Sequence, residues 1–181
     1  MDKLIIQQIN QQISNFSLPR YEQLPNIGLY IDQVVQIINT SLAPLCSEND
    51  QTWITTSMIN NYTKQGLIKR PQKKRYDKEQ IAYLIYICLT KSVMQIANIK
   101  QLINSQKELY DVDTAYDFFC TEFEKALQTV FMQKILQPTA VSKETEQIFL
   151  LRATVLTIAQ QIYLNKYLSV TKQQNDTKTD K

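Results

Sequence analysis

The stretch ITTSMINNYTKQGLIKRPQKKRY, residues 54–76, decides how the rest of this chain is interpreted. Thr55 is a good N-cap, and Gly66 lies where a left-handed C-terminal cap would fall, so a short helix is predicted over residues 56–65. The two faces of this helix differ, with Ile59 and Tyr62 turned inward and with hydroxyl, amide and ammonium groups turned outward on Thr56, Ser57, Asn60, Asn61 and Lys64.

Positive charge is concentrated just after this helix. Residues 64–78 hold seven cations and one acid, a net charge of +6, whereas the whole chain carries +3. Clustered cations suit a polyanion, because neutralising neighbouring phosphates releases counterions. A solvated, lysine-rich turn would carry the same charge, so the flanking pattern has to decide. The residues expected to meet phosphate are Lys69, Arg70, Lys73, Lys74, Arg75, Tyr76 and Lys78.

The flanking pattern predicts a mainly α-helical chain. A small hairpin over residues 67–76 is expected, starting with Leu67 and Ile68 as a strand, and an Asp-x-x-Gln capping box then opens a helix over 78–91. With only two glycines, the chain lacks the turn residues of an all-β domain. Apolar periodicity predicts further helices over residues 3–16, 29–42, 95–105, 114–136 and 143–168.

The order of these elements is that of a winged helix-turn-helix domain followed by a C-terminal helical region. In such a domain one helix reads base edges in the major groove, while a basic wing holds phosphate alongside. The expected divisions are an N-terminal helix and linker over 1–26, the winged helix-turn-helix over 27–105, a helical dimerisation or effector region over 106–170, and a disordered tail over 171–181.

Residues 57–103 resemble the DNA-binding domain of MerR-type regulators. The resemblance rests on a Tyr before a Gly-Leu turn, a wing ending in Arg-Tyr, and a helix pair closing on Ile-Lys-x-Leu-Ile. Here those positions are Tyr62, Gly66, Leu67, Arg75, Tyr76, Ile99, Lys100, Leu102 and Ile103. The chain departs from the pattern at Asn60 and Thr63, where those regulators usually carry an Arg and an acid, and its connection over residues 44–53 is longer than their tight turn.

A closer resemblance is to an uncharacterised bacterial family called domain of unknown function 1836. It rests on LPRYEQLPNIGLYIDQV at residues 18–34 and on SMINNYTKQGLI at residues 57–68, before KKRY. This second resemblance extends over most of the chain up to residue 105. It supports the fold and implies no ligand.

The expected function is that of a DNA-binding transcriptional regulator. The amides of Asn60 and Asn61 match adenine N6 and N7, with Asn60 favoured, and Lys64 reaches guanine or phosphate. Contact with about six phosphates would give a log–log salt slope near −5. The alternative is a winged helix that docks another protein without specific DNA binding, for which the slope would be much shallower.

The C-terminal helices are rich in aromatics, and we expect them to form a homodimer. They could also line a pocket for a small-molecule effector of unknown identity, although aromatic side chains at helical spacing are more often plain core. The acids Asp111, Asp113, Asp117, Glu122 and Glu124 are interpreted as a solvated helix face.

Enzymatic activity is not expected. The chain has no histidine, no glycine-rich phosphate loop and no nucleophile elbow, so no cofactor or metal is predicted. Cys46, Cys88 and Cys120 are too far apart for a ligand set and are expected to be reduced packing residues. With no signal peptide and no uncharged apolar run long enough for a bilayer, we expect a cytoplasmic protein with no membrane partner.

Overall fold

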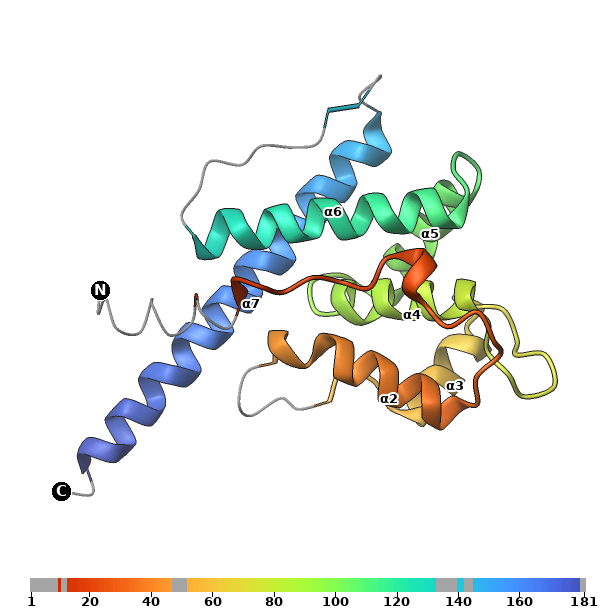
Figure 1. Cartoon of the computed structure of the whole chain (residues 1–181). Coiled ribbons are helices and arrows are strands. Elements are labelled where there is room, and N and C mark those ends of the chain that lie inside the picture. The colour runs from red at the N-terminus through yellow and green to blue at the C-terminus, as the bar shows by residue number, and fades with distance from the viewer. Residues whose placement is uncertain (1–9, 11–12, 47–51, 133–139, 142–144, 180–181) are drawn as a thin grey trace.

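The computed structural model describes residues 10, 13–46, 52–132, 140–141 and 145–179. Within these ranges the protein is mainly helical and has no β-strand, which confirms the predicted mainly α-helical class (Figure 1). The elements in chain order are η1 (Tyr21–Gln23), α2 (Ile31–Leu42), η2 (Ala43–Leu45), α3 (Thr56–Lys64), α4 (Lys78–Thr90), α5 (Ile96–Lys107), α6 (Val112–Phe131) and α7 (Glu146–Thr179), where η marks a short 3₁₀ helix.

The helix ends are set by the signals that the sequence contains. The Thr55 hydroxyl accepts from the Met58 N–H at 3.3 Å and so caps α3, while Gly66 has a φ of +68° just beyond its last turn. At the start of α4, the Gln80 N–H donates to Asp77 at 2.9 Å, and the Asp77 N–H donates to Gln80 at 2.8 Å. The predicted capping box is therefore confirmed.

Helix α4 is the centre of the molecule. It is buried on almost every side, with Ile81, Leu84, Ile85, Cys88 and Leu89 inaccessible to solvent. Figure 1 shows α2 and α3 on one side of α4 and α6 and α7 on the other. One continuous apolar core joins both sides, so the predicted divisions at residues 105 and 106 are not separate cores.

The predicted hairpin strand at Leu67 and Ile68 is wrong. Successive strand side chains point to opposite faces, yet these two are both buried, at 2% and 4% exposure. The returning Tyr76 pairs instead with Leu29, with N–H to O distances of 2.9 and 2.8 Å. An isolated bridge between Gln72 and Arg75 is all that the predicted hairpin retains.

The acids of α6 do not form a solvated face throughout. Glu122 is buried and its carboxylate accepts from Arg152 Nε of α7 at 2.8 Å. Glu124 pairs with Arg20 at 2.7 Å and also accepts from the Leu18 N–H. Through these pairs Glu122 holds α7, and Glu124 holds the segment before η1, against α6. Sequence spacing alone does not reveal these partners.

Both chain ends differ from expectation or lie outside the described ranges. The predicted helix over 3–16 falls almost wholly outside them. Helix α7 runs to Thr179, although a disordered tail was expected from residue 171, because a formed helix extends at little cost where no Gly or Pro interrupts it. Helix α6 ends at Phe131 rather than at residue 136.

Part of α7 is apolar enough to be compared with a membrane span. The stretch Glu146–Tyr167 has a mean hydropathy of 1.2, and 33% of it is buried against the rest of the protein. A core helix of a soluble protein passes the same test. Its Arg152 is paired with Glu122, and the Lys166 ammonium donates to the Cys46 carbonyl at 2.8 Å, contacts that fit packing against protein.

Candidate nucleic-acid interface

The outward face of α3 is polar and accessible. Its inward residues, Ile59 and Tyr62, are 0% and 5% exposed, and burial raises the pKa of Tyr62. The five residues predicted to contact bases are all exposed, namely Thr56, Ser57, Asn60, Asn61 and Lys64. This helix therefore presents hydroxyl, amide and ammonium groups along one side.

The approach to α3 is fixed by one asparagine and one tryptophan. The side-chain oxygen of Asn39 accepts from the N–H groups of Trp53 at 2.8 Å and Ile54 at 3.1 Å. Its amide nitrogen donates to the Ile54 carbonyl at 2.9 Å. The Trp53 indole donates to the Leu42 carbonyl at 2.9 Å, so α3 starts at a set position against α2 despite a long connection.

Two lysines hold α3 against α4 and α5. The Lys100 ammonium of α5 donates to the Gln65 carbonyl, just after α3, at 2.7 Å. The Lys91 ammonium, just after α4, donates to the Trp53 carbonyl and lies 3.6 Å from the sulfur of Met58. Both ends of α3 are thus tied to neighbouring helices, and these two cations are occupied within the protein.

Residues 67–76, called here the basic loop, carry most of the clustered cations. At its tip Lys73 and Lys74 have φ values of 46° and 62°, and the Arg75 N–H donates to the Gln72 carbonyl at 2.8 Å. Positive φ at both central residues is the geometry of a type I′ turn, which Asn-Gly would adopt with less strain. Both lysines are exposed.

The base of the basic loop is fixed to its surroundings. The Gln80 amide donates to the Lys69 carbonyl at 2.8 Å, and Tyr76 is paired with Leu29. A Cβ on Gly28 would lie 3.0 Å from the Cβ of Arg75, so a side chain here would require Arg75 to shift. In Figure 1 the basic loop and α3 lie at the same end of the molecule, away from α6 and α7.

Three of the predicted phosphate contacts are engaged elsewhere. Lys69 pairs with Glu79 at 2.9 Å, a hydrogen bond that raises the pKa of Lys69. Lys78 has a side chain only 14% exposed; it lies over the Tyr21 ring and 3.5 Å from Glu22. The guanidinium of Arg75 donates to the Gly28 carbonyl at 3.0 Å and stacks 4.5 Å above the ring of Tyr30, although the residue is exposed.

Tyr76 is only 3% exposed, and burial raises its pKa, so it is not among the residues proposed below to contact phosphate. The remaining predicted cations are exposed, and no ion pair involves them in the part of the chain that the structure describes. They are Lys64, Arg70, Lys73 and Lys74.

Residues that position α3 were missed by the sequence analysis. Neither Asn39 nor Lys91 was singled out, and Lys100 was not recognised as a support. Sequence offers one signal for Lys100, which belongs to the Ile-Lys-x-Leu-Ile ending quoted above. For Asn39 no local signal exists, since its partners lie 14 and 15 residues away.

The cysteines and acids form no metal site in the described ranges, and Cys46, Cys88 and Cys120 form no disulfide there. Burial raises the pKa of Cys88 to about 12, which keeps this thiol protonated.

Comparison with known families gives one match. The profile of a family described as "Domain of unknown function (DUF1836)" matches residues 19–119, more than half of the chain. The matched region runs from just before η1 to the first half of α6. No curated protein and no solved structure matches the chain.

Proposed function

Because the chain belongs to the DUF1836 family, whose description assigns no activity, we propose its function from its own surface: it is a DNA-binding transcriptional regulator of the winged helix-turn-helix type. The observation that carries this proposal is the pairing of a rigidly held, polar α3 with a basic loop at the same end of the molecule. Neither a catalytic role nor a cofactor is part of the proposal.

Helix α3 has the size and chemistry of a groove reader. An α-helix with its side chains is about 10–12 Å in diameter and fits a major groove about 12 Å wide, along which the nine residues of α3 extend about 13 Å. Asn60 and Asn61 offer paired donors and acceptors to adenine, and Lys64 offers a donor to guanine or phosphate. The ties to Asn39 and Lys100 favour this role, because a reader must hold its side chains in a fixed register.

The basic loop is proposed to hold phosphate. The other clustered cations are engaged within the protein. The contact is therefore assigned to Arg70, Lys73 and Lys74 of the basic loop, together with Lys64 at the end of α3. Four phosphates would give a log–log salt slope of about −3.6, shallower than the value near −5 that six contacts would give.

We further propose that the protein is a homodimer formed through α7. Exposed residues recur along one side of this helix at steps of three and four, as in a coiled-coil seam. They include Phe149 at 64% exposure and Leu164 at 56%, with Ala153, Thr157 and Gln160 between them. A two-fold dimer would place two α3 helices on half-sites about 34 Å apart.

Selection of bound fragments from random double-stranded DNA tests the proposal. We expect enrichment of an inverted repeat and a salt slope near −7 for the enriched site, because each of the two half-sites contributes about −3.6. The same titration with a matched random duplex measures the unspecific part. Absence of any enriched sequence, together with a slope near zero, would contradict DNA recognition.

The runner-up is a winged helix that docks a protein. It is favoured by apolar residues close to the basic loop, where Ile27 is 70% exposed and Tyr30 is 50% exposed. Binding that survives high salt and needs Ile27 would support it. The charges of Lys73 and Lys74 favour the nucleic acid, because a surface for apolar docking has no need of two exposed cations on a strained turn.

A further inference from the structure

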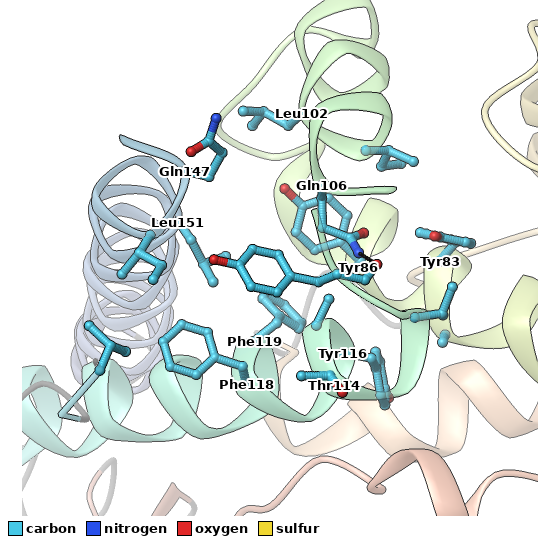
Figure 2. A pocket seen from close by; sticks show the side chains of 17 residues that line it. Tyr83, Tyr86, Leu102, Gln106, Thr114, Tyr116, Phe118, Phe119, Gln147 and Leu151 are labelled. Carbon is cyan, nitrogen blue, oxygen red and sulfur yellow. Dashed lines mark hydrogen bonds between the residues drawn. The ribbon is translucent and has the colours of Figure 1, made fainter. Parts of the chain in front are cut away.

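A pocket of about 300 Å³ lies between the two halves of the molecule, apart from the proposed DNA contact (Figure 2). Four helices form its walls. Tyr83 and Tyr86 come from α4, Leu102 from α5, Phe118 from α6 and Leu151 from α7. Figure 2 shows the ring of Tyr86 reaching across the space toward Leu151. The pocket therefore joins α4 and α5, which support α3, to the C-terminal helices.

The lining has no formal charge. Aromatic and aliphatic side chains form most of the wall, and none of the described residues that line the pocket is Lys, Arg, Asp or Glu. Lys107 lies near, but its ammonium is held 4.5 Å above the ring of Tyr83. A charged ligand would lose its hydration without gaining a partner, so an uncharged ligand is favoured.

Two polar groups in this lining, the hydroxyls of Tyr83 and Tyr116, are buried and make no hydrogen bond within the described part of the chain. Burial raises the pKa of Tyr83 to about 12, so the hydroxyl stays protonated at neutral pH and remains a donor. An unsatisfied buried hydroxyl is costly, and a ligand oxygen would remove that cost.

We propose that this pocket binds an uncharged, mainly apolar molecule that carries one hydrogen-bond acceptor, and that occupancy is transmitted to α3 through α5. A cavity of about 150 Å³ holds one benzene, so this pocket suits a molecule of about two rings or a medium alkyl chain. Its volume lies at the lower end of the range for small-molecule sites, about 300–1,000 Å³.

The route to α3 is short. Helix α5 lines the pocket through Leu102, and its Lys100 donates to the Gln65 carbonyl at the end of α3. A ligand that moves α5 away from α6 must move this hydrogen bond or break it. The consequence for DNA rests on the proposed function, whereas ligand binding and the response of α3 do not.

Binding is tested on the full chain with 2-naphthol, indole and 1-octanol, and with naphthalene-2-sulfonate as the charged counterpart of 2-naphthol. Isothermal titration should show saturable binding of at least one neutral probe, and the sulfonate should bind at least tenfold more weakly than 2-naphthol. Saturable binding of none of the three neutral probes, or equal binding of the sulfonate, would overturn the proposal.

Pocket variants locate the bound probe. Ala115→Phe fills the pocket from α6 and should abolish binding, whereas Ala97→Leu, on an exposed position of α5 outside the pocket, should not alter it. Tyr83→Phe should lower the affinity for 2-naphthol and 1-octanol by about threefold to tenfold, which corresponds to the loss of one hydrogen bond, and should leave the affinity for indole unchanged. Unaltered binding to Ala115→Phe would place the probe elsewhere and sink the assignment.

Transmission to α3 is measured by amide hydrogen exchange of Gln65 and Leu67, whose N–H groups donate to Asn61 and Tyr62. A saturating neutral probe should change their exchange by threefold or more, and Lys100→Met should remove this response while the probe still binds. Unchanged exchange at saturation would overturn transmission. If probe binding and exchange respond but no DNA is bound, the proposed function fails and this inference stands.

Discussion

The two ends of this molecule are both helical but differ in what their side chains do: one exposes polar and charged groups, and the other buries aromatic rings. At one end α3 and the basic loop leave amides and ammonium groups in water, and at the other α4, α6 and α7 bury aromatic rings such as Phe119 and Phe123, stacked 5.9 Å apart. Both ends bury apolar residues, including Ile59 of α3 and Leu67 of the basic loop, but only the first end carries clustered cations at its surface. Changes to those cations and changes to the buried rings should therefore affect different measurements.

The largest effect is expected in the aromatic core. Phe123→Ala removes a ring that is inaccessible to solvent, and should lower the free energy of unfolding by about 3–5 kcal/mol. Ile27→Ala, at a residue 70% exposed beside the basic loop, should change it by no more than about 0.5 kcal/mol. Urea denaturation of both variants checks this, and equal losses would break the comparison.

The next effect separates charge from turn geometry in the basic loop. Lys73→Asn with Lys74→Gly removes two charges and at the same time favours the type I′ turn. If both lysines meet phosphate, DNA affinity should fall roughly 60-fold per bound half-site at 0.1 M salt, and the salt slope should become shallower by about 1.8 per half-site.

All DNA sequences should lose affinity alike in this variant. The control, Lys73→Arg with Lys74→Arg, keeps both charges and should bind normally. Loss of DNA binding in the Arg-Arg control, or unchanged DNA binding in the Asn-Gly variant, would contradict a contribution of the two charges to DNA affinity. Fluorescence anisotropy over a salt series gives both quantities.

A smaller and more selective effect is expected on α3. Asn60→Ala should reduce discrimination at one base pair by about 1–3 kcal/mol, because a bidentate contact to adenine is lost. Asn61→Ala is the matched variant and should reduce discrimination less. Competition with duplexes altered at single positions measures both, and a uniform loss of affinity across all sequences would argue against α3 as the reader.

A last effect, confined to alkaline pH, is a dependence of stability on pH that arises in the apolar half. Burial raises the pKa of both Cys88 and Cys120 to about 12, so the folded thiols keep their protons while unfolded thiols lose theirs from about pH 9. The unfolded state then binds fewer protons, and stability should fall as pH rises from 9 toward 12, by up to about 1.4 kcal/mol per unit for each thiol.

The alkaline slope is best compared between wild type and Cys88→Ala with Cys120→Ala, using urea denaturation from pH 8 to pH 10.5. The double variant should be less stable at pH 8 but lose less with rising pH. An identical slope in both proteins would exclude the thiols as its source.

Much of the helical frame could be predicted because its signals are local. The capping box at Asp77 and Gln80, the cap at Thr55 and the left-handed Gly66 involve residues three or fewer positions from the helix ends that they set. The pairing that replaces the expected hairpin could not be predicted, because the partner of Tyr76 is Leu29, 47 positions earlier in the chain, rather than a residue of the basic loop.

The candidate site was predictable in its exposed part only. The outward residues of α3 follow from helical spacing. Whether a lysine or arginine is available to bind phosphate, in contrast, depends on whether an acid of another segment lies beside it. Lys69 and Lys78 appear as free charges in the sequence and are paired in space with Glu79 and Glu22. Contact between DNA and the exposed cations Lys64, Arg70, Lys73 and Lys74 stays a prediction, and so does the homodimer.

The amino-acid sequence by itself determined the mainly helical class, the faces of α3 and the clustering of charge, because periodicity and capping act within a few residues. Tertiary structure alone decided which lysines are free, how α3 is tied to α5, and that a neutral pocket opens between α4 and α7. Those features depend on side chains brought together from distant segments, whose packing no local pattern encodes.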